Sequence, residues 1–226
     1  MLNLINILTL TLVNIKEKEK CPKIQLQNNP KINLTEYIRA TWYVQQQQLN
    51  GYQSLDDLYC VLATYNIDNY SHVPFFDGKV ISVYNYANKN KVNGNSMPNN
   101  NSINNVLCAR QKNQSTPEKL SVAPCFLPNI FSGPYWILSA GPYTYNYKWA
   151  VVVGGQPTLR INNNTCTTKT YGINNSGLWI FSREKILNNN TLEYIRKLMN
   201  EKGISTSKLY NVTQKGCNYI NAYIKN

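Results

Sequence analysis

The sequence predicts an all-β fold in which eight short antiparallel strands precede one helix. Three observations lead to this prediction. Segments rich in Val, Ile, Tyr and Trp alternate with clusters of Asn, Gly and Pro, at spacings typical of an antiparallel barrel or sandwich. A single segment near the carboxyl end changes to the helical period. No internal repeat and no Gly-rich nucleotide-binding loop interrupts the pattern.

The strands are short, and their number favours a barrel. Eight antiparallel strands can close into a cylinder whose interior holds side chains or one small ligand, and closure removes exposed sheet edges. We expect the strands at Trp42–Leu49, Tyr59–Asn66, Lys79–Ala87, Val106–Gln111, Lys119–Pro124, Tyr135–Ala140, Tyr147–Gly154 and Leu178–Ser182. The asparagine-rich stretch Asn88–Asn105 cannot bury itself, so we expect a mobile loop there.

The helix is expected at Asn190–Lys202, where apolar residues recur on one side. Asn190 or Thr191 would cap its start, and Gly203 would end it. Because the apolar stripe is single, the helix must pack on the outside of the barrel wall. The stripe consists of Leu192, Ile195, Leu198 and Met199. A further short strand is expected at Ser207–Val212.

The chain length and charge limit the function classes. The 226 residues suffice for one domain and leave no room for a second, so we expect a leader over residues 1–20 and a barrel domain over residues 21–226. The net charge of +12 would favour anionic partners. However, the basic residues are scattered, with no basic block interleaved with aromatics, so we expect no nucleic-acid partner. A weak association with a membrane surface stays open.

The cysteines and the amino terminus indicate secretion. Six widely spaced cysteines favour disulfides over metal, because metal sites use closely spaced ligands and His72 is the one imidazole in the sequence. Disulfides imply an oxidising compartment. The apolar run Met1–Val13 is too short to span a bilayer and is expected to be part of a signal peptide. Among the Asn-x-Ser/Thr sequons, Asn100 and Asn163 are expected glycan sites, because they fall in predicted loops.

Five fragments, taken in order, resemble the lipocalin family, and within it the apolipoprotein D and insecticyanin type. The resemblance spans Cys21 to Cys217, although the glycine of the first motif is replaced by Ala40. The fragments are Cys21-Pro22, the G-x-W-Y-like segment ending in Trp42-Tyr43, the C-x-x-A-x-Y-like Cys60–Tyr65, the pair Pro134–Leu138 and Tyr147–Val152, and Leu178–Arg183.

The resemblance implies an up-and-down lipocalin-like barrel with the helix outside, carrying a small hydrophobic ligand such as a fatty acid, retinoid, sterol or tetrapyrrole. It implies that Arg183 lies across the indole of Trp42 at the closed end of the barrel, in a cation–π contact. By the same analogy Cys21 pairs with Cys166 and Cys60 with Cys217. Cys108 and Cys125 remain, and they flank a hairpin-like stretch that they plausibly bridge.

The candidate ligand-binding residues follow from the alternation of side chains along strands. If Arg183 and Trp42 point inward, then residues two, four and six positions away on the same strands share their faces, and matching parity on the second strand adds Ala63 and Tyr65. The register of the third strand is not fixed by the sequence, so either Ile81 and Val83 or the opposite set faces inward. The expected lining residues are Val44, Gln46, Gln48, Ala63, Tyr65, Val83, Trp179 and Phe181.

The sequence does not predict an enzyme. His72 lies in a predicted loop without a nearby Ser or Cys motif, the acids are dispersed, and every cysteine has an expected partner. We expect no cofactor, no metal and no catalytic residue. Two alternatives stay open: a lipid-modifying lipocalin-type enzyme, and a barrel whose open-end loops bind a partner protein that the sequence does not identify.

Overall fold

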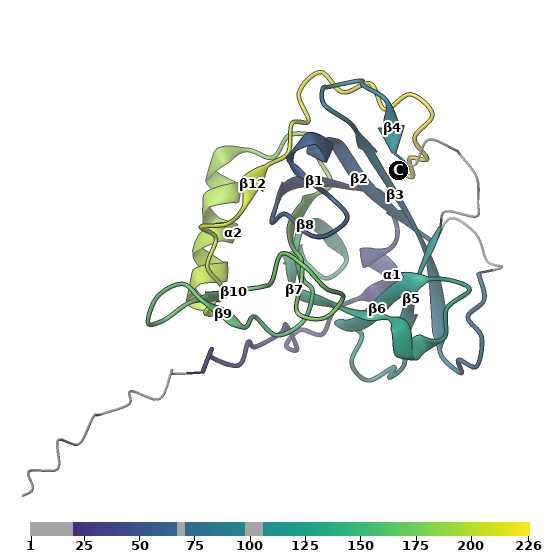
Figure 1. The fold of residues 1–226 in the computed structure, drawn as a ribbon. Helices are drawn as coiled ribbons and strands as arrows, with labels where there is room; N and C mark the ends of the chain where they lie inside the picture. Colours follow the sequence, from purple (N-terminus) through teal and green to yellow (C-terminus); the bar gives the residue numbers. More distant parts are fainter. Residues whose placement is uncertain (1–19, 67–70, 98–105) are drawn as a thin grey trace, which may run out of the picture.

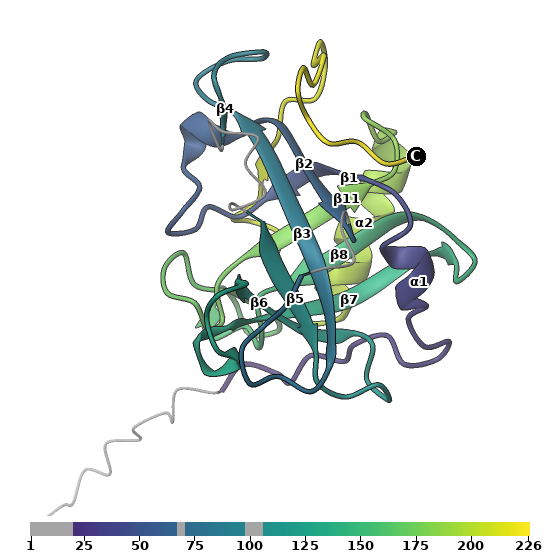
Figure 2. The same cartoon turned by 90° about the vertical axis from the view of Figure 1, so that its right-hand side faces the viewer.

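The computed structural model describes residues 20–66, 71–97 and 106–226. Within these residues, eight antiparallel strands close into a barrel because β11 pairs with both β8 and β1. Figure 2 shows β3 crossing one side of the barrel beside β2 and β5. The barrel strands are β1 (Trp42–Gln47), β2 (Tyr59–Tyr65), β3 (Lys79–Asn88), β5 (Leu107–Gln111), β6 (Lys119–Pro124), β7 (Gly133–Tyr143), β8 (Asn146–Val153) and β11 (Leu178–Ser182).

All eight expected strands are confirmed, with small differences at their ends. The sequence missed several minor elements, and the helical ones among them are α1 (Leu34–Tyr37), η1 (Leu55–Asp57) and η3 (Asn129–Phe131). It also missed the two-residue strands β4 (Ser96–Met97), β9 (Leu159–Arg160) and β10 (Cys166–Thr167). The strand expected at Ser207–Val212 is shortened to β12 (Tyr210–Asn211), which pairs with β1.

The prediction of a mobile loop at Asn88–Asn105 is wrong for its first part. There β4 pairs with the end of β3, with Ala87 opposite Met97, so the chain forms a hairpin. The amide of Asn88 stabilises the turn by donating to the carbonyl of Gly94 at 3.0 Å. Residues 98–105, including Asn100, lie outside the described residues, as do residues 1–19 of the expected leader.

The helix α2 (Asn189–Glu201) lies outside the barrel, as expected (Figure 1). Ile195 and Met199 are fully buried against outward-facing residues of β7, β8 and β11. The predicted cap is wrong by two or three residues, because the side chain of Asn188 accepts the hydrogen bond from the Thr191 amide at 2.8 Å. None of the helices in the described parts of the chain is long and apolar enough to cross a membrane.

The three expected disulfides are confirmed: Cys21–Cys166, Cys60–Cys217 and Cys108–Cys125. The first joins the amino-terminal segment to β10 in the small sheet of β9 and β10, and the second joins the carboxyl-terminal tail to β2 of the barrel. The third joins the start of β5 to the residue after β6 and closes a separation of 17 residues.

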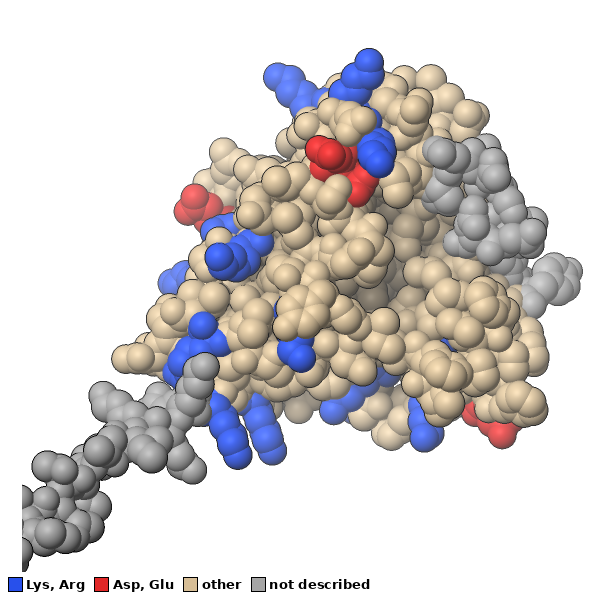
Figure 3. Space-filling view, in the orientation of Figure 1, with Lys and Arg blue, Asp and Glu red and all other residues tan. Residues whose placement is uncertain are grey.

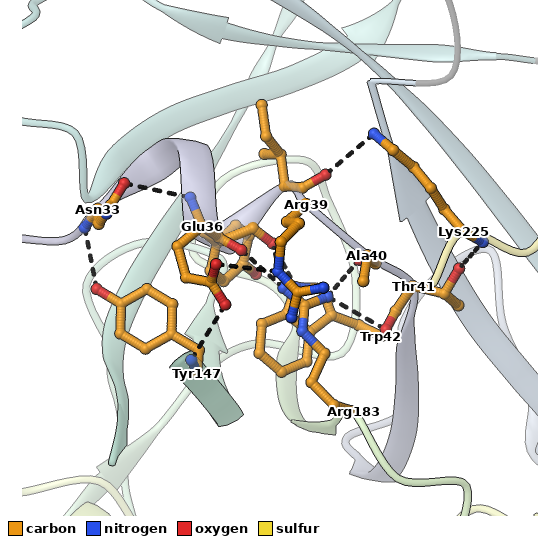
Figure 4. A network of polar contacts seen from close by, with 11 residues as sticks. Asn33, Glu36, Arg39, Ala40, Thr41, Trp42, Tyr147, Arg183 and Lys225 are labelled. Atoms are coloured by element: carbon orange, nitrogen blue, oxygen red, sulfur yellow. Dashed lines mark hydrogen bonds and ion pairs between the residues drawn. The ribbon is translucent and has the colours of Figure 1, made fainter. Parts of the chain in front are cut away.

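The floor of the barrel is closed by Arg183, which follows β11. Its guanidinium carbon lies 3.4 Å from the ring centroid of Trp42, so the predicted cation–π contact is confirmed. The guanidinium also donates to the backbone carbonyls of Glu36, Tyr37, Ala40 and Thr41 (Figure 4). Burial lowers the pKa of Arg183 to about 10, which leaves the group charged at neutral pH. One side chain thus joins α1, β1 and β11.

The carboxyl-terminal tail covers the same floor from outside. The Thr41 amide donates to the Lys225 carbonyl, and the Lys225 amide donates to the Thr41 hydroxyl, each at 2.8 Å. The ammonium group of Lys225 donates to the carbonyls of Tyr65 and Asn66, both at 3.3 Å. The tail therefore fixes the end of β2 against the start of β1; Figure 4 shows its contact with Thr41.

We expect Arg183→Met to lower the free energy of unfolding by about 3 kcal/mol. The change removes the cation–π contact and leaves several backbone carbonyls without donors. Urea unfolding of the oxidised protein measures the effect. Lys197→Met, at an exposed position on α2, is the control and should change stability by less than ~0.5 kcal/mol. Equal effects of the two substitutions would contradict the role of Arg183.

The long-range disulfides and the short-range Cys108–Cys125 disulfide should differ in their contribution to the free energy of unfolding. Loop-closure entropy predicts a loss of about 3 kcal/mol for Cys108→Ala/Cys125→Ala and about 5 kcal/mol for Cys60→Ala/Cys217→Ala, because the closed loops span 17 and 157 residues. The comparison uses urea unfolding of both variants under identical conditions. A larger loss for the Cys108–Cys125 pair would contradict the chain-entropy argument.

Candidate functional site

The interior of the barrel is apolar, and many of its side chains are small. Inward-facing residues of all eight strands belong to one buried cluster, which also includes Tyr37 and Ile38 from the segment before β1. Aromatic rings concentrate at the floor, where Trp42 stacks on Phe181 with 6.2 Å between centroids. Many other inward residues of the cluster are alanine or valine: Val44, Val61, Ala63, Val83, Ala87, Ala109, Val122, Ala150 and Val152. Their side chains are small and apolar.

The interior is open to solvent at the end opposite the floor. On β3, Val83 and Ala87 are buried in the interior cluster, whereas Asn85, which alternation places on the same face, is exposed. Leu107, Val122 and Trp179 pack against the cluster but are only partly buried. Asn85 lies beyond Val83, the last residue of β3 that pairs with β5, so solvent reaches the inward face of β3 from the open end. Figure 3 shows a hollow, surrounded by uncharged side chains, near the middle of this face.

Tyr52, in the loop between β1 and β2, reports on the same hollow. Its side chain is 72% exposed, so solvent reaches the ring. Desolvation nevertheless raises its pKa to about 12, and its phenol interacts electrostatically with that of Tyr65. The ring is therefore accessible to solvent, while its phenol lies within electrostatic range of Tyr65.

The structure brings six of the eight predicted lining residues together. Val44, Ala63, Tyr65, Val83 and Phe181 are buried in the interior cluster, and Trp179 packs against it. The register left open for β3 is now fixed, because Ile81 and Val83 face inward with Ala63 and Tyr65.

The predicted orientation of Gln46 and Gln48 is wrong. The pairing of β1 with β11 shifts between Val44 and Gln46, and this bulge reverses the alternation. Gln46 accepts a hydrogen bond from Arg196 of α2 at 2.7 Å, on the outer face. Gln48 accepts from Thr167 and donates to the Thr168 carbonyl, each at 2.6 Å. Neither residue belongs to the interior site.

Gln47 takes the inward position instead. It is directly opposite Trp179 in the pairing of β1 with β11, and residues paired in this way share a face of the sheet. Its amide nitrogen donates to Gln53 at 2.8 Å. Its buried amide oxygen has no hydrogen-bond partner among the described residues. The side-chain amide of Gln47 therefore lies in the interior, although strict alternation along β1 predicts that it faces outward.

Three tyrosines at the floor form a hydroxyl cluster that the sequence did not predict. The Tyr135 hydroxyl lies 2.6 Å from that of Tyr37 and 2.5 Å from that of Tyr65. Burial raises the pKa of Tyr65 to about 12 and the pKa values of Tyr37 and Tyr135 well above the usual range. All three phenols are therefore protonated at neutral pH. Alternation in the segment starting at Tyr135 could have placed Tyr135 inward, but no periodic signal identifies Tyr37.

Neither a free thiol nor a metal-ligand cluster is found among the described residues. All six cysteines lie in disulfides. His72 is exposed in the loop before β3. No group of three or more His, Cys, Asp or Glu side chains that could hold a metal occurs in the described ranges. The interior can therefore bind an apolar molecule through its walls and a polar group through amide and hydroxyl groups.

Comparisons with known proteins agree with this architecture. No family model matches the chain. Apolipoprotein D of Mus musculus is 28% identical over 109 residues, which cover 48% of this chain and 49% of that protein, so the chain spans about half the length of this curated relative.

Solved structures resemble the chain over most of its length. The cockroach allergen Per a 4 has a TM-score of 0.51 at 17% identity and covers 91% of this chain and all of its own. Apocrustacyanin C1 has a TM-score of 0.53 at 18% identity, covering 90% and 94% of the two chains. Lobster apocrustacyanin A1 has a TM-score of 0.51 at 18% identity, covering 89% and 94%.

The fold and its site define a class of protein: a closed antiparallel barrel with an apolar interior, plugged at one end and flanked by one outer helix. This is the lipocalin fold. The partial sequence similarity to apolipoprotein D agrees with this fold.

The raised pKa of Tyr65 makes a prediction about alkaline stability. Between pH 10 and 12 the phenol ionises in the unfolded chain but stays protonated in the folded protein, so the wild type loses stability as the pH rises. Tyr65→Phe lacks this titration. We expect the stability difference between wild type and variant to shrink by about 1 kcal/mol from pH 8 to pH 11. Urea unfolding at both pH values measures it, and a constant difference would contradict the assignment.

Proposed function

We propose that the protein is an extracellular carrier or scavenger that binds one small hydrophobic molecule inside its barrel. The observation that carries this proposal is the exposed, inward-facing Asn85 above an apolar interior. Solvent reaches Asn85 at the open end, directly beside the buried apolar residues Val83 and Ala87. Apolar walls with a few polar groups are the usual composition of a site for a small ligand.

An extracellular location is supported by the disulfides. Three bridges persist only where the surroundings are oxidising, and two of them fix the terminal segments. The expected signal peptide over residues 1–20 fits the same location. Asn163 is exposed in the loop before β10, which suits a glycan site.

Carriage rather than catalysis follows from the chemistry of the interior. The phenols of Tyr37, Tyr65 and Tyr135 are protonated donors and therefore weak nucleophiles or bases. The bridged cysteines cannot attack a substrate. The lipid-modifying alternative would require a reactive group that the described residues of the barrel do not present.

A second candidate function is protein binding through the open end. The loop between β6 and β7 exposes Phe126, Ile130 and Phe131, and the segment before β11 exposes Tyr171 and Ile173. Large exposed apolar side chains favour an interaction surface. This candidate predicts that substitution of Phe126 and Ile130 by Ser abolishes partner binding without changing the uptake of small ligands.

The carrier proposal is tested by filling the hollow. Asn85→Trp adds a large ring at an inward position that is not packed against the core. We expect it to weaken binding of the neutral probe N-phenyl-1-naphthylamine by at least tenfold. The wild type should bind one probe per barrel, and the bound probe should quench the fluorescence of Trp179. Fluorescence titration measures both effects.

Lys148→Trp, at an exposed outward position on β8, is the matched control and should bind the probe like the wild type. Trp179→Phe should abolish most of the quenching without abolishing binding. The carrier proposal fails if the wild type shows no saturable binding across a panel of lipophilic probes, or if Asn85→Trp and Lys148→Trp behave alike.

A further inference from the structure

The tail segment Tyr210–Gln214 forms part of the barrel wall. Within the described residues, the direct pairing of β1 with β2 ends at Tyr43 and Leu62, one residue above Trp42 at the floor. Above this point β12 lies beside β1, with Gln47 opposite Tyr210. The upper part of β1 therefore pairs with the tail on the side where it pairs with β2 lower down.

Backbone hydrogen bonds join the tail segment to the wall on both sides. On the side of β1, the Val212 amide donates to the Gln45 carbonyl at 2.9 Å. On the side of β2, the Thr213 amide donates to the Leu58 carbonyl, and the Cys60 amide donates to the Thr213 carbonyl, each at 2.9 Å. The segment thus lies between β1 and β2 as a short additional strand.

Two side chains of the tail segment complete the wall. The buried amide of Gln214 donates to the carbonyls of Val44 in β1 and Val61 in β2, each at 2.7 Å. Val212 is buried in the same interior cluster as Val44 and Val61. The tail segment therefore lines the interior beside the space that we assign to the ligand.

The sheet is irregular where the tail is attached. The pairing of β2 with β3 shifts between Tyr59 and Leu62, and Cys60 has a φ of 54°, which is uncommon for a residue other than Gly. The tail supplies hydrogen-bond partners to backbone groups that a neighbouring strand would otherwise satisfy. The disulfide between Cys60 and Cys217 ties the tail covalently to this part of the wall.

The Cys60–Cys217 disulfide can be attacked from outside the barrel. Cys60 is fully buried, whereas Cys217 is partly exposed. A thiolate of a dithiol attacks the sulfur of Cys217, the S–S bond breaks, and Cys60 leaves as a thiolate. The second thiol of the reductant then displaces Cys217 and closes a disulfide within the reductant. One protein disulfide is thereby reduced to two thiols while one dithiol is oxidised.

We propose that the tail segment Tyr210–Gln214 is a side opening of the binding site, and that a dithiol speeds the release of the ligand by reducing Cys60–Cys217. Without the covalent tie the segment detaches by local opening. Detachment removes Val212 from the interior and leaves a gap between β1 and β2 beside Val44. This proposal rests on the carrier function and adds a regulation of the same site.

The test times the release of N-phenyl-1-naphthylamine from loaded, oxidised protein into an excess of phosphatidylcholine vesicles, with and without dithiothreitol. Cys108→Ala/Cys125→Ala is the matched control, because it keeps the Cys60–Cys217 bridge. We expect dithiothreitol to speed release roughly tenfold from the wild type and from this control. Cys60→Ala/Cys217→Ala should release the probe at the faster rate without dithiothreitol and should not respond to it.

Hydrogen exchange of the reduced wild type distinguishes local opening from unfolding. We expect the amides of Cys60, Val212 and Thr213 to lose protection while those of β8 keep it. A simultaneous loss of protection in all strands overturns the proposal, because release then follows unfolding. The proposal is also overturned if dithiothreitol leaves the release rate of the wild type unchanged, or if it speeds release from Cys60→Ala/Cys217→Ala to the same extent.

Gln214→Leu tests the opening with all three disulfides intact, and it decides the question if the double cysteine variant does not fold. The substitution removes two hydrogen bonds between tail and wall, so we expect release about threefold faster. Gln156→Leu, whose amide donates to the Pro22 carbonyl, is the control and should release the probe like the wild type. Equal rates for the two variants overturn the proposal. If the wild type does not bind the probe at all, the carrier function itself fails.

Discussion

The packing of the Arg183 guanidinium on the indole of Trp42 is the contact on which the architecture depends most. Nothing else in the described structure joins the last barrel strand, the first barrel strand and the segment before it through one side chain. An uncompensated cation at this depth would be unfavourable, and the carbonyl oxygens of α1 and β1 together with the indole face solvate it. The floor is therefore stabilised by interactions that also fix the ends of the strands (Figure 4).

The floor and the walls of the barrel are built from different side chains, and this difference creates the site. Aromatic rings and their hydroxyl groups occupy the bottom, where Trp42, Phe181 and the three tyrosines at the floor contact one another. Alanine and valine line much of the wall above. The result is an apolar hollow with its polar groups at the base and, through Gln47 and Asn85, on the wall. Such a distribution orients a ligand that has one polar end.

The sequence predicted the fold well because the alternation of side chains, the turn residues and the single amphipathic helix agree with one another. The disulfide pairs Cys21–Cys166 and Cys60–Cys217 came from the family resemblance, since spacing alone leaves the pairing open. The candidate site was predicted less completely. Alternation placed Val44 correctly but failed at Gln46 and Gln48, because a bulge in β1 has no sequence signal comparable to the period of a strand. Tyr37 precedes the strand and joins the site only through tertiary packing.

Whether a ligand occupies the space enclosed by the eight strands can be tested most directly with a crystal of the protein soaked in 1-bromododecane, because the anomalous signal of bromine locates the chain end. We expect one bromine site inside the barrel, between the tyrosines at the floor and the open end. Bromine bound only on the outer surface, for example beside α2, or an interior closed by repacked side chains would contradict it.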